Sequence, residues 1–218
     1  VITEYEKDER KGVITLLESA QKRINVYEYE LLRIKELSKY EEKYKEYPYI
    51  CGIDEVGRGP FAGPVVAGAV ILPKNCNILY LNDSKQLSKK MREELTIEIK
   101  EKAIAYGIGI VQPGVIDEIN ILQATYQAMR QAIENLSVKP DILLNDAVTI
   151  PDINYKQVPI IKGDAKSISI AAASIIAKTA RDEMMLEYDK IYPGYDFSHN
   201  SGYGAPKHIA ALKELGPT

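Results

Sequence analysis

The sequence predicts an α/β fold, a mixed β-sheet flanked by helices, preceded by a helical N-terminal extension. Three observations carry this prediction. Residues 1–47 are charge-dense and contain a single glycine, Gly12, whereas short apolar runs begin directly after Pro48. Three of these runs have the length and β-branched content of strands. The remainder of the chain then alternates helical and strand patterns, which is typical of a mixed sheet with helices on its faces.

The extension is expected to form two helices, because its apolar residues recur at steps of three or four. Pro48 ends the second helix. The stripes are Val13, Leu16, Leu17, Ala20 and Ile24 in the first helix, and Tyr27, Leu31, Ile34, Leu37, Tyr40, Tyr44 and Tyr47 in the second. Either the extension packs on the main domain, or its lysines contact phosphates as an arm. Glutamates interleave those lysines, which favours packing.

Residues 1–48 are therefore predicted to be a helical extension and residues 49–218 the main domain. Strands are expected at residues 49–53, 65–72, 103–111, 142–144 and 158–161, and helices at 87–99, 122–136, 167–188 and 207–215. Ser167 is a suitable N-cap for the helix that follows it. The small residues of segment 170–178 (IAAASIIAK) allow that helix to approach the sheet closely.

Composition restricts the class of protein. A net charge of −3 argues against a protein that coats nucleic acid by bulk charge, although a local basic patch remains compatible with it. Cys51 and Cys76 are too few for a disulfide framework or a zinc site, and we expect both to be reduced. No run of about 18 apolar residues is present, so we expect a monomeric cytoplasmic protein that does not contact a membrane.

Four carboxylates follow predicted strands. Asp54 and Glu55 end the first strand, Asp146 follows the run at 142–144, and Asp164 follows the run at 158–161. An isolated Asp-Glu pair is more often a solvated turn, but three strand ends that deliver carboxylates match the sites at the carboxyl edges of α/β sheets. Oxygen ligands without a histidine cluster suit Mg²⁺ or Mn²⁺. Two such ions held by carboxylates are a recurrent device for phosphodiester hydrolysis.

Four segments in order resemble the signatures of ribonuclease HII, the type 2 ribonucleases H. They are residues 52–60 (GIDEVGRGP) continuing to Ala67, residues 83–87 (DSKQL), residues 162–175 with KGDAKS and AAASI, and residues 202–204 (GYG) with Lys207 and His208. The resemblance covers residue 49 to the C-terminus. It implies a ribonuclease H-like fold and an endonuclease that hydrolyses the RNA strand of RNA/DNA hybrids. It also implies cleavage 5′ to single ribonucleotides in duplex DNA, leaving 3′-hydroxyl and 5′-phosphate ends.

The same resemblance assigns roles to the carboxylates. Asp54, Glu55, Asp146 and Asp164 match the catalytic, metal-binding residues of the family. The counterpart of Asp54 contacts both ions, those of Glu55 and Asp146 mainly one, and that of Asp164 mainly the other. Asn145 departs from the family pattern, in which an apolar residue stands before the third carboxylate, and we expect its side chain to point away from Asp146.

Substrate-binding residues are also implied. The turn Gly57-Arg58-Gly59 would contact the 2′-hydroxyl that distinguishes RNA from DNA, and Tyr203 would stack on the deoxyribose after the ribonucleotide. Lys85 and Lys166 are the preferred phosphate contacts because they lie inside matched motifs. Further basic candidates are Lys162, Lys178 and Arg181. His199 and His208 are as compatible with a structural role in the C-terminal loop as with a functional one.

Three other interpretations are weaker. A non-catalytic nucleic-acid-binding module would need the phosphate contacts but not the four carboxylates. A P-loop enzyme is excluded because the pattern G-x-x-x-x-G-K-[ST] does not occur. Type 3 ribonucleases H carry a larger N-terminal domain and lack the arginine-centred turn in this form. The sequence itself indicates no protein partner.

Overall fold

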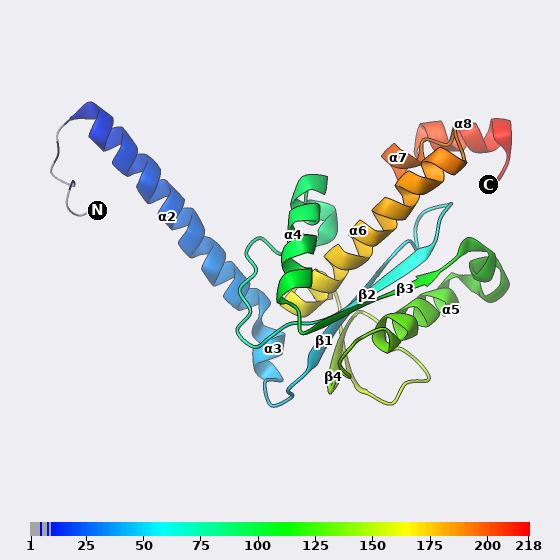
Figure 1. Ribbon diagram of the computed structural model, residues 1–218, viewed down its shortest axis with the longest axis horizontal. Helices are drawn as coiled ribbons and strands as arrows, with labels where there is room; N and C mark the ends of the chain where they lie inside the picture. Colours follow the sequence, from blue (N-terminus) through cyan, green and yellow to red (C-terminus); the bar gives the residue numbers. More distant parts are fainter. Residues whose placement is uncertain (1–4, 6–7, 9) are drawn as a thin grey trace.

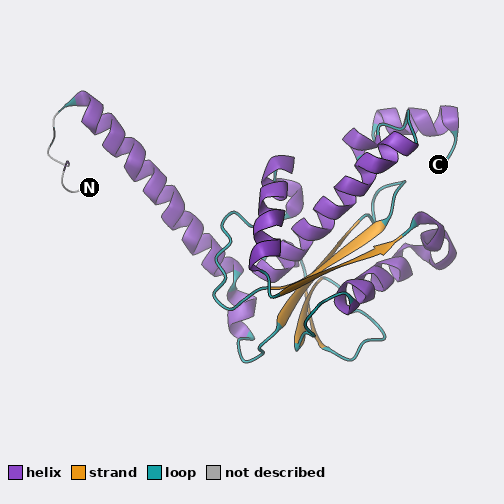
Figure 2. Cartoon of the chain, in the orientation of Figure 1, coloured by secondary structure: helices purple, strands orange, loops and turns teal. Residues whose placement is uncertain are grey.

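The computed structural model describes Tyr5, Asp8 and residues 10–218. Its centre is a five-stranded sheet in the order β3-β2-β1-β4-β5 (Figures 1 and 2). The strands are β1 (Ile50–Val56), β2 (Val65–Ile71), β3 (Ala105–Val111), β4 (Ile142–Asp146) and β5 (Lys156–Ile160). β1 pairs with β2, and β2 with β3, in antiparallel fashion, whereas β1–β4 and β4–β5 are parallel. The predicted mixed sheet is confirmed.

Helices cover both faces of this sheet. α4 and α6 lie over one face and α5 over the other (Figure 1). The helices are α2 (Lys11–Leu37), α3 (Lys39–Lys43), α4 (Lys89–Lys102), α5 (Pro113–Glu134), α6 (Ile168–Ile191), α7 (Phe197–Asn200) and α8 (Pro206–Leu215), with two 3-10 turns, η1 (Ser84–Gln86) and η2 (Gly163–Ala165). None of the helices in the described part of the chain combines the length and apolar character needed to cross a bilayer.

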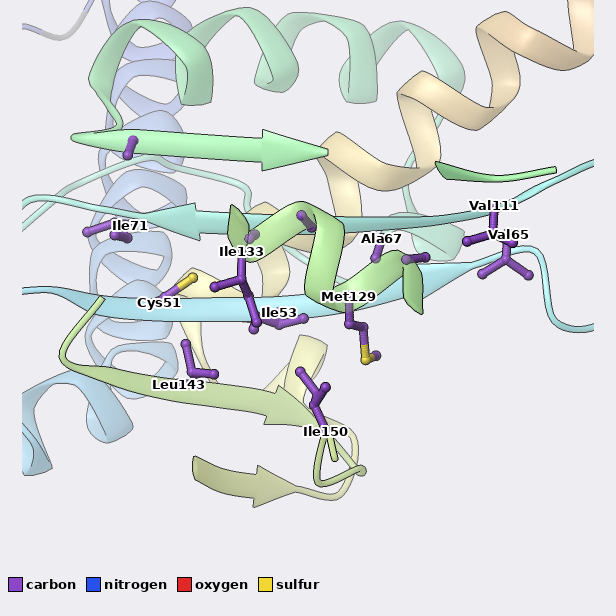
Figure 3. Packing of buried hydrophobic residues seen from close by; sticks show 14 of the residues in the cluster. Cys51, Ile53, Val65, Ala67, Ile71, Val111, Met129, Ile133, Leu143 and Ile150 are labelled. Carbon is purple, nitrogen blue, oxygen red and sulfur yellow. The ribbon is translucent and has the colours of Figure 1, made fainter. Parts of the chain in front are cut away.

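The hydrophobic core is divided by the sheet. On the α5 side, Cys51 and Ile53 of β1 pack with Met129 and Ile133 of α5 and with Leu143 of β4 (Figure 3). Cys51 is fully buried and carries a free thiol, and burial raises its pKa to about 12. On the other side, α4 and α6 pack on β2. β1 is thus shielded on both faces, which gives its polar residues a largely water-free setting.

The helices of the extension differ from the prediction. α2 is one continuous helix through Leu37, so the expected break between Ile24 and Tyr27 is wrong; no glycine or proline separates these two residues. The helix ends at Leu37, and its C-cap Ser38 donates to the Ile34 carbonyl both from its amide, at 3.0 Å, and from its hydroxyl, at 2.8 Å. The short α3 then follows, and Tyr44 and Tyr47 lie beyond its end.

The second half of the extension packs on the main domain, as the favoured interpretation predicts. Ile34 and Leu37 are buried in the same cluster as α4 and α6. Glu30 forms an ion pair with Arg33 and accepts from the Tyr80 amide. The first half of α2 is exposed and projects away from the sheet (Figure 1). All the sequence motifs thus lie after the composition break at Pro48, but the hydrophobic core extends across it to Ile34 and Leu37.

Most other element bounds shift by a few residues. The exception is α5, which begins at Pro113 and not at residue 122 as expected, and Asn120 interrupts it with a non-helical backbone at φ 69°. Ser167 is the N-cap of α6 as predicted and accepts from the Ile170 amide at 3.3 Å. α7, a single turn before the C-terminal helix, is absent from the prediction because four residues carry no periodic signal.

The approach of α6 to β1 leads to a stability prediction. A Cβ at Gly52 would lie 2.1 Å from the Ser169 carbonyl carbon and 2.3 Å from the Ile170 nitrogen, and this backbone cannot rotate away. We therefore expect Gly52→Ala to lower the free energy of unfolding by about 2–3 kcal/mol, as overpacking against a rigid neighbour does. Urea denaturation measures this change.

Gly114→Ala is the matched control, because no atom lies within 4 Å of its added Cβ. That change should leave stability unaltered or raise it by up to about 1 kcal/mol, since alanine is the better helix former. Equal effects of the two substitutions would contradict the close approach of α6 to β1.

Candidate active site

The first two carboxylates lie where β1 ends. Asp54 is only 5% exposed, and its Oδ1 accepts from the Glu55 amide at 2.8 Å. Glu55 Oε1 accepts from Arg58 Nη1 at 3.2 Å. Glu55 Oε2 is buried and has no hydrogen-bond partner among the described residues. β1 thus delivers one buried carboxylate and one carboxylate with an unused, water-excluded oxygen.

The other two carboxylates come from neighbouring strand ends. Ile53 of β1 is aligned with Asn145 of parallel β4, so Asp146, the last residue of β4, lies at the level of Asp54 in β1. Asp164 lies in η2, directly after β5. The Gly163 amide donates to Asp146 Oδ1 at 2.7 Å and ties the two segments together. The parallel register therefore brings all four predicted carboxylates to one end of the sheet.

These carboxylates influence one another's ionisation. Burial raises the pKa of Asp54 well above its ordinary value, and the charges of Glu55 and Asp146 raise it further, while the Ser174 hydroxyl opposes the shift. Burial also raises the pKa of Glu55, against the effect of Arg58. The pKa of Asp164 is raised by burial and then by the charges of Asp83 and Asp146. Burial is thus the main cause of the raised pKa values, and neighbouring carboxylates add to it.

A hard divalent cation fits this donor set. All four donors are carboxylates, the ligand type that Mg²⁺ and Mn²⁺ prefer. Glu55 has a buried oxygen without a partner among the described residues, and the pKa values of Asp54 and Glu55 are raised. A bound cation would contact that oxygen and stabilise the ionised form of both carboxylates. Within residues 10–218, together with Tyr5 and Asp8, no three His, Cys, Asp or Glu side chains lie close enough together to hold a metal ion as they stand. The ligands would therefore have to draw together around an ion.

The glycine turn and Tyr203 are neighbours. Gly57 has φ 105°, and a Cβ there would lie 2.4 Å from the Pro64 carbonyl oxygen, so the turn requires glycine. Gly59 is exposed, and its Cβ position lies 3.5 Å from Cε1 of Tyr203. Tyr203 is 40% exposed, and Arg58, next to Gly59 in the sequence, is exposed as well. Of the residues predicted to contact the sugars, Arg58, Gly59 and Tyr203 are therefore exposed, with Gly59 against Tyr203, whereas Gly57 is buried.

The basic candidates separate into two groups. Lys85 and Lys166 are exposed; Lys85 lies close enough to Asp54 and Asp164 to feel their charges, and Lys166 follows Asp164 by two residues in the sequence. Partial burial lowers the pKa of Lys85, but the charges of Asp83, Asp54 and Asp164 outweigh this effect and raise it overall. Lys162 is also exposed and adopts a left-handed backbone before η2.

Arg181 and Lys178 are not phosphate contacts, contrary to their candidacy. Arg181 is fully buried, and its guanidinium donates to the carbonyls of Pro64, Ser201 and Ala62 at 3.0, 2.8 and 3.0 Å. Lys178 donates to Asp182 at 2.5 Å in a largely buried ion pair. Sequence alone could not separate these cations from exposed ones, because burial of a charge depends on partners far away in the chain.

The histidines and Asn145 have structural roles. His208 is fully buried, and its Nδ1 lies 2.8 Å from the Tyr203 carbonyl oxygen, which fixes the loop that carries Tyr203. His199 is exposed and pairs with Asp196. The Asn145 amide donates to the Val148 carbonyl and to Gln157, so it faces away from Asp146 as expected.

Sequence reasoning missed two contributors to the site. Ser174 of α6 faces Asp54 and also pairs with the Ser84 hydroxyl at 3.0 Å. Phe61 is 67% exposed, and its amide donates to the Gly202 carbonyl at 2.8 Å, which joins the glycine-rich loop to the Tyr203 loop. Serine inside a small-residue helix and one aromatic after a turn offer no distinctive signal.

Known sequences resemble this chain over its whole length. The family model described as Ribonuclease HII matches residues 51–218, and the one described as Ribonuclease HII N-terminal domain matches residues 1–45. Ribonuclease HII of Lachnoclostridium phytofermentans is 63% identical over 214 residues, 98% of this chain and 84% of the relative. Ribonuclease HII of Enterococcus faecalis is 53% identical over 219 residues, 100% of this chain and 86% of the relative.

Solved structures share the fold. The ribonuclease H2 of Pyrococcus horikoshii superposes with a TM-score of 0.66 at 28% identity, over 77% of this chain and 86% of that one. The RNase HII of Archaeoglobus fulgidus, solved in a complex with PCNA, gives a TM-score of 0.58 at 28% identity, over 76% and 86% of the two chains.

Proposed function

Because the chain belongs to the ribonuclease HII family of endonucleases, we propose that it is a metal-dependent hydrolase of the RNA strand in RNA/DNA hybrids. We further propose that it cuts 5′ to single ribonucleotides embedded in duplex DNA. The observation that carries the proposal is the arrangement at the end of the sheet. Carboxylates from β1, β4 and η2 lie at one end of the sheet, where Asp146 accepts from the Gly163 amide and its charge acts on Asp54, and the exposed Gly59 lies against Tyr203.

The proposed cofactor is Mg²⁺ or Mn²⁺, with two ions in the catalytic complex. When bound, the ions would supply Lewis-acid chemistry that activates water and stabilises the leaving 3′ oxygen. Asp54, Glu55, Asp146 and Asp164 would hold them. Arg58 donates to Oε1 of Glu55, which leaves Oε2 free to bind an ion. In the same way, the Gly163 amide donates to Oδ1 of Asp146 and leaves its other oxygen for an ion.

The chain's own residues would select the substrate. Gly59 lacks a Cβ where the 2′-hydroxyl must approach the backbone, and Gly57 and Arg58 complete that turn. Tyr203, fixed through its carbonyl by His208, offers a ring to the sugar that follows the ribonucleotide. Lys85 and Lys166 flank the carboxylates and would contact phosphates. These assignments rest on adjacency, exposure and charge.

The organisation of the protein is part of the proposal. Residues 49–218 would form the catalytic domain and residues 1–48 a helical extension. We propose that the protein is a monomer, that it acts on RNA/DNA hybrids and on ribonucleotide-containing duplex DNA, and that it does not bind a membrane. The proposed location is the cytoplasm, where the proposed substrates would be met.

Mapping the cut on a duplex with one ribonucleotide tests the function. With Mg²⁺ or Mn²⁺ we expect cleavage on the 5′ side of the ribonucleotide, a 3′-hydroxyl on the upstream DNA and a 5′-phosphate on the ribonucleotide. This polarity follows if water is the nucleophile and the 2′-hydroxyl is only recognised. A 2′,3′-cyclic phosphate would contradict the mechanism. Binding without cleavage would favour the non-catalytic module.

Tyr203→Ala tests the junction contact on the same substrate. We expect it to reduce cleavage of the single-ribonucleotide duplex about tenfold more than cleavage of a long RNA/DNA hybrid, because a stacking contact is worth about 1–3 kcal/mol. Tyr192→Ala is the control, since Tyr192 has the same 40% exposure but lies at the far end of α6. Equal losses on both substrates would remove Tyr203 as the junction contact.

A further inference from the structure

Glu41 of α3 contacts the first turn of α6. Its Oε1 accepts from the Ser167 hydroxyl at 2.5 Å and from the Ser169 amide at 3.0 Å. Both serines are buried, with exposures of 0% and 1%. The first amides of a helix have no partner within the helix, and a carboxylate there is favoured by the helix dipole. The N-terminal extension therefore supplies a charged cap to a helix that begins more than a hundred residues later in the chain.

That helix start adjoins the candidate active site. Ser167 closes the turn that contains Asp164, because its amide donates to the Gly163 carbonyl at 2.8 Å. The Gly163 amide in turn holds Asp146. Ser169 lies in backbone contact with Gly52, two residues before Asp54. A shift of the first turn of α6 would consequently move the segments that carry three of the four carboxylates.

Glu41 is itself in an energetically unfavourable position at the start of α6. Its second oxygen, Oε2, is buried and has no hydrogen-bond partner among the described residues. Leaving a buried acceptor unpaired costs free energy. Glu42, the next residue, shows the usual alternative: its side chain is 65% exposed and pairs with Lys45 on the surface. Glu41 is thus held at the start of α6 despite this cost.

We propose that Glu41 is a positioning residue through which the N-terminal extension fixes Asp164 and Asp146 for the reaction. The inference rests on the proposed function, because it concerns the same carboxylates. It assigns a task to the extension: residues 30–43 hold α6 by burying Ile34 and Leu37 and by capping its first turn. Glu41 acts through Ser167 and Ser169 and does not itself touch the substrate.

The experiment compares Glu41→Ala and Glu41→Gln with Glu42→Ala in the full chain. Steady-state cleavage of the single-ribonucleotide duplex is measured against substrate and Mg²⁺ concentration, well below the melting temperature. For Glu41→Ala we expect kcat to fall about 10- to 100-fold with KM for the duplex within about twofold, because misplaced groups lose rate more than binding. The Mg²⁺ concentration that gives half of the maximal rate should be higher for Glu41→Ala than for the wild type. Glu41→Gln keeps an acceptor and should recover most of kcat, and Glu42→Ala should match wild type.

Amide hydrogen exchange of the metal-free protein gives a readout that does not depend on activity. We expect Ser169 to exchange at least about tenfold faster in Glu41→Ala, because its amide loses its acceptor, and to stay unchanged in Glu42→Ala. Unaltered kcat in Glu41→Ala, with or without a lower melting temperature, would overturn the inference. So would unaltered exchange at Ser169. An inactive wild type would instead overturn the proposed function, and exchange at Ser169 would still decide whether the cap exists.

Discussion

Replacing Asp54 by asparagine is expected to reduce cleavage by at least about a thousandfold while it stabilises the metal-free protein. The amide is nearly the same size as the carboxylate but is a poor ligand for a hard cation. Losses of this size are typical when a residue that acts as part of a catalytic unit is removed. Binding of the duplex should persist, because Gly59, Tyr203 and the lysines are untouched.

The gain in stability follows from the ionisation of Asp54. Its pKa in the folded protein is raised by burial and by Glu55 and Asp146, so it lies above the value in the unfolded chain. Such a group favours the folded state at acid pH and loses that contribution as the pH rises through the folded-state pKa. The asparagine should therefore raise the free energy of unfolding by about 1–2 kcal/mol at pH 8 and by much less at pH 5.

Urea denaturation in EDTA at the two pH values, together with a cleavage assay in Mg²⁺, measures both effects. Asp152→Asn is the control, because this aspartate is 86% exposed in its side chain and lies outside the site. It should leave both quantities nearly unchanged. Wild-type turnover by Asp54→Asn would remove Asp54 from the metal site, and no gain at pH 8 would show that its charge is already compensated without an ion.

Arg181→Met is expected to lower the free energy of unfolding by about 3–5 kcal/mol. The buried guanidinium donates to the carbonyls of Ala62, Pro64 and Ser201, and methionine would leave all three without this partner. These carbonyls belong to the loop after Gly57 and to the loop before Tyr203. The substitution should therefore also loosen the surface on which Gly59 and Tyr203 meet.

Lys178→Met is the matched control on the same helix. Lys178 makes one ion pair, with Asp182, and Asp182 keeps a second ion pair with Arg92 at 3.0 Å, so the loss of Lys178 should cost clearly less, about 1–2 kcal/mol. Arg181→Lys should behave like the methionine variant, because one ammonium cannot reach three carbonyls that a planar fork contacts together. Thermal and urea unfolding measure the three variants. A loss no larger than that of Lys178→Met would refute the bracing role of Arg181.

The sequence contains most of the fold because the signals are local. Apolar runs predict the strands, Ser167 predicts the start of α6, and carboxylates after strands predict which residues meet at one edge of the sheet. Two helices were expected in the extension and two are present, but the expected break near Asn25 was wrong, because the sequence has no glycine or proline there and the chain breaks instead at Ser38, between α2 and α3.

Long-range contacts are what the sequence could not supply. In the sequence Arg181 looks like a surface cation, and only the fold shows that the carbonyls of Ala62 and Ser201 surround it. Likewise, Glu41 looks like any glutamate on a helix surface, and only the fold shows that it contacts Ser167. The family resemblance identified Asp54, Glu55, Asp146 and Asp164 by their motifs. Their mutual effect on pKa required the parallel register of β1 and β4.

The two kinds of strand pairing around β1 have a consequence for folding kinetics. Val56 pairs with Val66 across a short loop, whereas Ile50 pairs with Ile142 only after the whole of α4, β3 and α5. Closing the longer loop costs more chain entropy and is slower. Asp54 and Glu55 can thus be ordered in an early hairpin, but Asp146 joins them only with the late parallel pairing. If the proposed ligand assignment holds, a partly folded chain, such as one still emerging during synthesis, should therefore be unable to cleave nucleic acid until β4, and then the segment with Asp164, have docked.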